Sequence, residues 1–227
     1  MASKIIERKV ISLDESQAKM AAAGWGKEAL EKTLAQIQKI SQAKAKIYSC
    51  DVSDPKQVKT TIEQIKADFG RIDILINNAA IWWQGELEEH SDEKLQELFN
   101  INTLGYIYTI KYVLPTMKQQ KSGQILNVVS IAGVDYEAGW APYVATKHAV
   151  RAFIESVRKE YAKYNIKVMG IYPPGMATEI FESAGFHYGR ADWMTDPKDI
   201  AEIILFMLSQ PKDIVLNHVE IRKLGWN

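Results

Sequence analysis

The sequence has a single cysteine, Cys50, which excludes an internal disulfide bond and is typical of a protein from a reducing compartment. It has no net charge, because 28 Lys and Arg residues balance 28 Asp and Glu residues, so no global field would attract nucleic acid or an anionic membrane. It also has no long apolar run and no signal-peptide pattern. We therefore expect a soluble cytoplasmic protein whose partners include neither nucleic acid nor membrane.

The sequence also offers no pattern for a metal site. The four histidines, at positions 90, 148, 187 and 218, are scattered without the spacing of metal ligands. Cys50 ends a strand-like run that starts at Lys46, which favours a buried structural thiol over a reactive one. We expect neither a bound metal nor thiol chemistry.

Strand-like and helix-like segments alternate along the chain. The run Ile72–Asn78 is apolar without alternation, which is typical of a parallel strand covered on both faces. With 227 residues and 47% hydrophobic content, the chain fits one α/β domain over residues 1–227, with a doubly wound parallel sheet flanked by helices. The other predicted strands are Lys9–Leu13, Ala45–Cys50, Gln124–Ser130, Ile166–Tyr172 and Ile214–Ile221. The predicted helices are Glu15–Ser41 (with a break near Gly24), Lys56–Phe69, Asp92–Lys118, Tyr143–Tyr164 and Pro197–Leu208.

The stretch from Ser130 to Lys147 carries the strongest candidate for chemistry. Tyr143 and Lys147 are four residues apart in a helical pattern, so they share one helix face. A cation beside a buried phenol favours the phenolate and lowers its pKa from the usual value of about 10. A phenol tuned in this way can exchange a proton near neutral pH, as the interconversion of a carbonyl and an alcohol requires. Ser130, at a strand end, is placed to hold the substrate oxygen.

Tyr143 is the only one of the ten tyrosines with a lysine four residues on, and Ser130 precedes it by thirteen residues. This pattern resembles the short-chain dehydrogenase/reductase family, whose active site is Asn, Ser, Tyr and Lys in that order. The resemblance runs from Lys9 to Asn227 and implies a Rossmann-like fold and NAD(P)-dependent oxidoreduction. It implies that Tyr143 handles the proton and Ser130 orients the oxygen. Lys147 would lower the tyrosine pKa and bind the nicotinamide ribose.

Asn102 is the residue that corresponds to the catalytic Asn of the family. It lies 28 residues before Ser130, within a predicted helix where Asn is a poor choice on propensity. In the family this residue opens the helix locally and holds a water that connects to the lysine. Asn100 is the rival candidate, but the spacing Asn-x-x-Gly105 fits Asn102 better.

Two further segments resemble the cofactor-binding parts of the family. Asp51, followed by Val52, resembles the aspartate that meets the adenine ring, although Asp here also suits the cap of the next helix. The run Asn77-Asn-Ala-Ala80 resembles Asn-Asn-Ala-Gly, a motif that stabilises the central strand and walls the cofactor site. This resemblance implicates Asn78, Ala79 and Ala80, the last in place of glycine.

Pro174-Gly175 at a strand end resembles the segment that shapes the nicotinamide pocket. Thr178 lies three residues after Gly175, one short of the family spacing for a Thr that contacts the carboxamide. Seven aromatic residues occupy loops that would surround the active site, and covering of the core is the alternative role for them. They are Trp82, Trp83, Tyr136, Trp140, Phe186, Tyr188 and Trp193.

The main departure from the family lies at the N-terminal end. The family opens with a strand and a glycine-rich turn, Thr-Gly-x3-Gly-x-Gly, that places pyrophosphate on a helix N-terminus. The sequence has no such motif, and Gly24-Trp-Gly26 falls within a helical pattern. Counting back from Asp51, the segment Lys9–Asp14 matches the second strand of the family. Asp14 would then accept the ribose hydroxyls and favour NAD over NADP, or else cap the following helix.

A missing first strand creates a physical difficulty, because that strand lies at the centre of the family sheet. Its loss would leave two inner strand edges with unpaired N–H and C=O groups. Three resolutions stay open. Lys4–Leu13 takes the central position itself and the second strand is lost, the sheet closes up or borrows a strand from a partner chain, or the sequence lacks a segment that the natural protein has. The close match after Asp51 favours an N-terminal unit that is missing or rewritten.

We expect an oxidoreductase that interconverts a carbonyl and a secondary alcohol with NAD(H) or NADP(H), NAD being favoured. The alternative is a non-catalytic remnant of the fold that acts as a binding or scaffold protein, because loss of the glycine-rich turn removes phosphate anchoring. The family resemblance also implies a homodimer or homotetramer.

Overall fold

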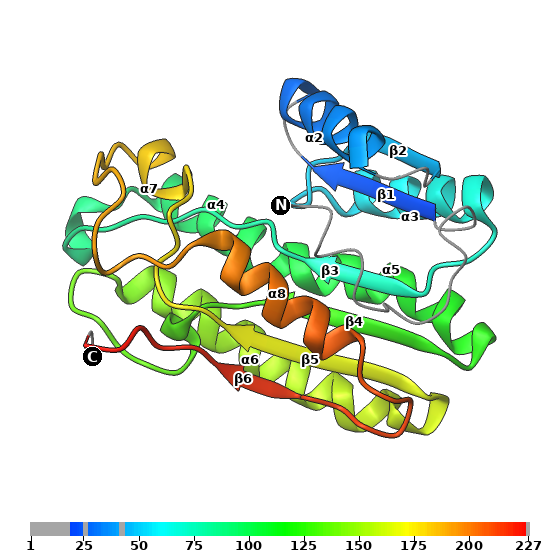
Figure 1. Ribbon diagram of the computed structural model, residues 1–227. Coiled ribbons are helices and arrows are strands. Elements are labelled where there is room, and N and C mark those ends of the chain that lie inside the picture. Colours follow the sequence, from blue (N-terminus) through cyan, green and yellow to red (C-terminus); the bar gives the residue numbers. More distant parts are fainter. Residues whose placement is uncertain (1–18, 25–26, 41–43, 226–227) are drawn as a thin grey trace.

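The computed structural model describes residues 19–24, 27–40 and 44–225, and it is an α/β structure (Figure 1). The strands are β1 (Lys19–Gly24), β2 (Lys44–Ser49), β3 (Ile74–Asn77), β4 (Gly123–Val128), β5 (Ile166–Tyr172) and β6 (His218–Glu220). The α-helices are α2 (Lys27–Ile40), α3 (Pro55–Phe69), α4 (Asp92–Phe99), α5 (Gly105–Gln120), α6 (Ala141–Tyr161), α7 (Ile180–Ser183) and α8 (Pro197–Leu208). Among the described helices, none is long and apolar enough to cross a membrane.

The strands form two parallel sheets. Strands β3, β4, β5 and β6 lie side by side in that order, and β1 pairs with β2 in a separate two-stranded sheet. The pairing runs from Ile74 beside Gln124 to Asn77 beside Asn127, so β3 and β4 end close to each other. Parallel strands joined through helices confirm the predicted Rossmann-like class.

Helices cover both faces of the larger sheet (Figure 1). Ile125 and Val168 pack in a core cluster with α5 and α6, whereas their chain neighbours Leu126 and Met169 pack in a cluster with α8. Consecutive residues of a strand point to opposite faces, so β4 and β5 present apolar side chains to both helix layers. The predominance of apolar residues in these two strands follows from this double burial.

The N-terminal part differs from the sequence prediction. The expected helix Glu15–Ser41 is wrong, because Lys19–Gly24 forms β1 and a helix begins only at Lys27. The small residues Ala21–Ala23 suit either structure locally, and parallel pairing with Lys44–Ser49 decides in favour of the strand. The strand beside β2 is therefore β1 and not Lys9–Leu13, and both Lys9–Leu13 and Asp14 lie outside the described residues.

Smaller corrections concern the ends of elements. The expected helix Asp92–Lys118 is divided by a π-helical turn at Asn100–Leu104 (η3). The expected loop between Met176 and Met194 contains the short helix α7. The last strand is limited to β6, within the predicted Ile214–Ile221.

A chain of buried amides holds the ends of the central strands together. Asn77 Nδ2 donates to Asn127 Oδ1 at 3.0 Å, and Asn127 Nδ2 donates to the Met169 carbonyl at 3.0 Å. The Thr109 hydroxyl of α5 donates to Asn77 Oδ1 at 2.8 Å. These contacts join β3, β4, β5 and α5 just below the sheet edge at which Ser130 lies. They fix the ends of β3, β4 and β5 relative to one another, and these strand ends position the candidate site.

We predict that Asn127→Leu destabilises the fold while Gln64→Leu, at an exposed position of α3, does not. The substitution keeps the number of side-chain heavy atoms and their branching but leaves Asn77 Nδ2 and the Met169 carbonyl without their partners. Each unpaired buried group costs about 1–3 kcal/mol. Urea denaturation followed by circular dichroism measures the free energies of unfolding. Equal stability of the two variants would contradict a structural role for the amide chain.

Candidate active site

Helix α6 brings Tyr143 and Lys147 to the protein interior. Pro142 occupies its first turn, where a missing N–H costs nothing. Tyr143 is 6% exposed and Lys147 is 1% exposed, so both lie on the buried face. The Lys147 Nζ lies 5.4 Å from the ring centroid of Tyr143 and 5.4 Å from that of Tyr106. A cation at this distance interacts favourably with an aromatic face.

Ser130 follows β4 in a strained backbone conformation. Its φ of 138° and ψ of 156° lie in a region that non-glycine residues rarely adopt. The Ser130 Oγ accepts a hydrogen bond from the Ala132 N–H at 3.1 Å, which starts a short 3-10 turn, η4 (Ile131–Gly133). The Ser130 hydroxyl also forms a side-chain hydrogen bond with Tyr143. The residues that the sequence pattern paired are therefore neighbours in space.

Burial controls the protonation of both groups. It raises the pKa of Tyr143 to about 12, and the hydrogen bond with Ser130 opposes this rise. Burial lowers the pKa of Lys147 to about 7. The shift of the Tyr143 pKa is upward and Lys147 is not among its causes, so the expected lowering of that pKa by Lys147 stays a prediction. An amine with so low a pKa is only partly charged near neutrality, and the cost of a buried phenolate outweighs its attraction.

Asn102 lies in the π-helical turn η3 and is fully buried. Its Oδ1 accepts from the Ile81 N–H at 2.9 Å, and its Nδ2 donates to the Ile81 carbonyl at 2.8 Å and to the Thr146 hydroxyl at 3.4 Å. Such turns are common at functional sites. The side chain thus fixes the segment after β3 against α6. These contacts are with Ile81 and Thr146, and the water that would connect Asn102 to Lys147 stays a proposal.

Sequence reasoning missed three residues that support this cluster. Thr146 donates from its hydroxyl to the Tyr143 carbonyl at 2.7 Å, and the Tyr106 hydroxyl donates to the Val128 carbonyl at 2.7 Å. A Cβ on Gly133 would lie 3.1 Å from the Lys147 carbonyl oxygen and 2.9 Å from the Val129 Cγ1, so only glycine allows η4 to approach α6 this closely. The sequence signal that could have indicated a role for Thr146 is its polar side chain directly before Lys147 in a helix that is otherwise buried on this side.

Asp51 and Val52 lie in the loop after β2. The Asp51 carboxylate accepts from the Ser53 N–H at 2.9 Å and from the Ser53 hydroxyl at 2.7 Å, so Asp51 shapes its own turn. The helix cap is instead Asp54, which accepts from the Lys56 N–H at 2.8 Å. Val52 contacts Gly105, where a Cβ would lie 3.0 Å from Val52 Cγ2. Gly105 of the Asn-x-x-Gly pattern therefore allows α5 to begin directly against this loop.

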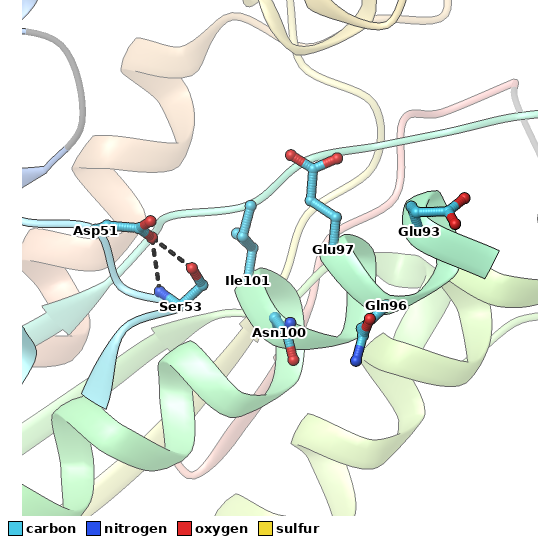
Figure 2. Close-up of a pocket in the computed structure, with 7 residues that line it drawn as sticks. All are labelled: Asp51, Ser53, Glu93, Gln96, Glu97, Asn100 and Ile101. Carbon is cyan, nitrogen blue, oxygen red and sulfur yellow. Dashed lines mark hydrogen bonds between the residues drawn. The ribbon is translucent and has the colours of Figure 1, made fainter. Parts of the chain in front are cut away.

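The side chain of Asp51 lines a cavity of about 270 Å³ between its loop and α4 (Figure 2). The other lining residues are Ser53, Glu93, Gln96, Glu97, Asn100 and Ile101. With three carboxylates in its wall, the cavity disfavours a phosphate. Within the part of the chain that the structure describes, no cluster of His, Cys, Asp or Glu is arranged to hold a metal ion. Tyr143, Ser130 and Lys147 do not line this cavity.

The remaining expected cofactor residues lie at the carboxyl ends of β3 and β5. Asn78 and Ala79 are exposed and Ala80 is half-buried, so the backbone after β3 is accessible. Pro174 and Gly175 are half-buried after β5, and Thr178 is exposed.

Trp193 lies directly against Gly175. A Cβ on that glycine would lie 2.1 Å from the Trp193 Cζ3, so the indole occupies the space that any other residue at 175 would need. The expected nicotinamide segment is therefore covered by an aromatic ring.

The loop aromatics form a cluster over Tyr143. Trp82 is 3% exposed and makes edge-to-face contacts with Trp140, Phe181 and Phe186 at centroid distances of 5.3, 5.0 and 5.2 Å. The ring centroid of Trp140 in turn lies 6.3 Å from that of Tyr143. Tyr188 and Trp193 belong to the same cluster through Phe181. Trp83 contacts Lys94 and also packs against this cluster, whereas the exposed Tyr136 stacks on His148 outside it.

A dinucleotide fits the reacting end of this arrangement by its chemistry. The accessible backbone after β3, the hydroxyl of Ser130, and the phenol and amine of α6 provide small residues and polar donors at one edge of the sheet. At the phosphate end, the described residues contain no glycine-rich turn between a strand and a helix. The described residues thus offer groups whose chemistry suits the nicotinamide end of a dinucleotide, although Trp193 lies over Gly175, and they offer no group of residues that suits its pyrophosphate.

Comparisons with known proteins agree with this geometry. A family model for short chain dehydrogenases matches residues 6–188. An uncharacterised oxidoreductase of Staphylococcus aureus strain MW2 is 33% identical over 211 residues, which cover 92% of this chain and 88% of the relative. One from Staphylococcus saprophyticus is 33% identical over 208 residues, with coverage of 90% and 86%.

Solved structures share the fold. The alcohol dehydrogenase of the archaeon Thermococcus sibiricus, in complex with 5-hydroxy-NADP, superposes with a TM-score of 0.84 at 24% identity and covers 91% of this chain and 86% of its own. An NAD⁺-bound xylitol dehydrogenase superposes with a TM-score of 0.76 at 26% identity, with coverage of 92% and 89%. With the matched family model and the close curated relatives, these findings show that the chain belongs to the short-chain dehydrogenase family of oxidoreductases.

Proposed function

We propose that the protein interconverts a carbonyl and a secondary alcohol with a nicotinamide dinucleotide. The observation that carries this proposal is the buried cluster in which Ser130 is hydrogen-bonded to Tyr143 and the Lys147 amine lies 5.4 Å from the phenol ring centroid. A strained serine, a phenol and a buried amine at one sheet edge have no evident structural use together.

The roles of the residues follow from their chemistry. When bound, the dinucleotide supplies or accepts a hydride. Tyr143 gives a proton to the carbonyl oxygen during reduction, and Ser130 holds that oxygen by a hydrogen bond. Because burial keeps the Tyr143 phenol protonated, the protein at rest is prepared for reduction, whereas oxidation needs the phenolate. A protonated Lys147 would favour that phenolate.

We propose that the cofactor lies along the carboxyl edge of the sheet. Its nicotinamide would approach Pro174, Gly175 and Thr178, and its ribose would meet Tyr143 and Lys147. Asn78, Ala79 and Ala80 would wall its middle part, with Asp51 and Val52 near the adenine. Several solved structures with this fold hold NADP or NADPH and another holds NAD⁺, so they do not decide between the two dinucleotides. A preference for NAD rested on Asp14 alone.

A Tyr-to-Phe pair tests the proton donor. We predict that Tyr143→Phe lowers kcat/KM for ketone reduction by about 100-fold to 10,000-fold, because the variant lacks the transferable proton. Tyr136→Phe is the matched control, since that side chain is 80% exposed and lies outside the cluster. Cofactor absorbance with a panel of ketones measures turnover, and circular dichroism checks folding. A folded Tyr143→Phe protein with the activity of the control would exclude the mechanism.

The second candidate function is a non-catalytic binding or scaffold protein. The specific observation in its favour is that Trp193 covers Gly175 while the described residues include no glycine-rich turn. Titration with NADH and with NADPH, followed by tryptophan fluorescence, separates the two functions. We predict saturable quenching in the micromolar range, because Trp193 must be displaced from Gly175 when a nicotinamide binds. Absence of saturation with both dinucleotides would favour the scaffold.

Lys147 makes a separate prediction on stability. Its pKa of about 7 in the folded protein lies below the ordinary lysine value of 10.5, so the unfolded chain binds more protons between these two pH values. The stability of the wild-type protein should therefore rise with pH across this window, and the full penalty, on the order of 5 kcal/mol, applies below about pH 7.

We thus predict that Lys147→Met is more stable than the wild-type protein at about pH 6, and that the difference shrinks by about pH 9.5. Lys66→Met, at an exposed position of α3, is the control and should follow the wild-type pH profile. Chemical denaturation at the two pH values measures the free energies of unfolding. A stability difference that is independent of pH would show that the Lys147 amine is not buried as described.

A further inference from the structure

The chain after β6 runs past the end of the sheet at which the candidate site lies. Figure 1 shows it continuing beyond the carboxyl ends of the strands, on the side where α7 lies. The Ile221 N–H donates to the Tyr172 carbonyl at 3.1 Å, so this residue is still held by β5. The next two side chains, those of Arg222 and Lys223, bind two loops that carry aromatic residues of the cluster over Tyr143.

Lys223 binds the loop that carries Trp193. Its half-buried ammonium group donates to the main-chain carbonyls of Asp192 and Met194, the latter at 2.9 Å. Trp193 lies between these two residues in the chain, and its ring occupies the space next to Gly175. Hydrogen bonds from a charged donor are about twice as strong as those between neutral groups. The Lys223 contacts therefore hold the backbone that carries the indole over Gly175.

Arg222 binds the loop that carries Trp140. Its Nη1 donates to Asp135 Oδ2 at 2.6 Å and its Nη2 donates to Asp135 Oδ1 at 3.1 Å. Trp140 ends that loop and makes edge-to-face contacts with Trp82 and Tyr143. The side chains of Arg222 and Asp135 are 44% and 48% exposed, so this ion pair contributes less than the Lys223 contacts.

We propose that the segment Ile221–Lys223 is a strap that holds the aromatic cover closed, and that its release at Lys223 controls how fast a dinucleotide enters. A nicotinamide reaches Gly175 only after Trp193 has moved away from it. If the strap keeps most molecules closed, the apparent affinity for the dinucleotide is reduced in proportion to the fraction that is open. The control of entry rests on the function proposed above, whereas the closure does not.

The alternative is that the Trp193 ring turns away from Gly175 while its backbone stays in place. Entry would then be independent of Lys223, because its contacts are with main-chain carbonyls. Substitution of the lysine separates the two possibilities.

Hydrogen exchange of the protein without ligand, read by mass spectrometry, tests the closure. The Met194 and Thr195 amides donate to main-chain carbonyls at 3.0 and 2.9 Å, so their exchange reports on this loop. Lys223→Met removes the charged donor but keeps the apolar stem, and these amides should exchange roughly tenfold faster in this variant. Lys212→Met, at an exposed position before β6, is the matched control and should exchange like the wild-type protein.

Arg222→Met tests the second anchor of the strap. The Trp140 amide, which donates to the Glu137 carbonyl at 3.2 Å, should exchange about two to five times faster, since an exposed ion pair contributes little. Arg71→Met is the matched control, because Arg71 forms a similar pair with Asp73 in the segment before β3. It should leave the exchange of Trp140 unchanged.

Rapid mixing with NADH and with NADPH, followed by tryptophan fluorescence, tests the control of entry. The association rate constant of Lys223→Met should exceed that of the wild-type protein roughly tenfold, and the apparent Kd should fall by a similar factor, because more molecules are open. Lys212→Met should match the wild-type protein in both.

A folded Lys223→Met protein that exchanges at the wild-type rate would overturn the proposal, as would faster exchange with unchanged association. If circular dichroism shows that Lys223→Met does not fold, Arg222→Met decides, and unchanged exchange of Trp140 would overturn the closure. Faster exchange in Lys223→Met, with no dinucleotide bound by any variant, would support the closure but refute both the control of entry and the proposed function.

Discussion

The burial of the Lys147 amine beside the phenol of Tyr143 is the constraint on which the site depends. Burying a charged amine costs free energy, because the amine loses its hydration. The Lys147 amine lies one helical turn from Tyr143 and contacts the rings of Tyr106 and Tyr143. Close contacts surround this turn of α6. Asn102 in the π-helical turn donates to the Thr146 hydroxyl, which in turn donates to the Tyr143 carbonyl. On another side, Gly133 allows η4 to approach the Lys147 carbonyl.

The same burial explains the protonation of Tyr143 and Lys147. Low polarity keeps the phenol neutral and lowers the pKa of the amine to about 7, so the amine is only partly charged near neutrality. The aromatic cluster that contains Trp82 and Trp140 maintains this low polarity by covering Tyr143. Binding of a substrate and a dinucleotide must rearrange part of this cover, most directly the indole of Trp193 against Gly175.

Much of the fold was predictable because its signals are local. The largely apolar sequences of β4 and β5 follow from burial on both faces. Asp196 followed by Pro197 marks the start of α8, where the Asp196 side chain accepts from the Lys198 N–H. The N-terminal strand was missed since Lys19–Gly24 is rich in alanine, which does not oppose a helix. Only pairing with a strand twenty-five residues later decides its structure.

The candidate site was partly predictable for the same reason. Ser130, Tyr143 and Lys147 stand at a fixed spacing along the chain, and one helix and one strand end bring them together. Thr146 could not be assigned a role, because its partner Asn102 lies 44 residues away and the contact depends on how α6 crosses η3. The rise in the Tyr143 pKa was also beyond the sequence, since the degree of burial is a property of the whole fold.

The central claim, hydride transfer to a carbonyl beside Tyr143, is tested most directly by following the hydride itself. Wild-type protein would be supplied with a ketone and with reduced nicotinamide dinucleotide that carries deuterium at both positions of the nicotinamide C4, and the product would be examined by NMR. The account predicts an alcohol that carries deuterium on its carbinol carbon. Product without that label, or no product from any ketone despite saturable cofactor binding, would contradict it.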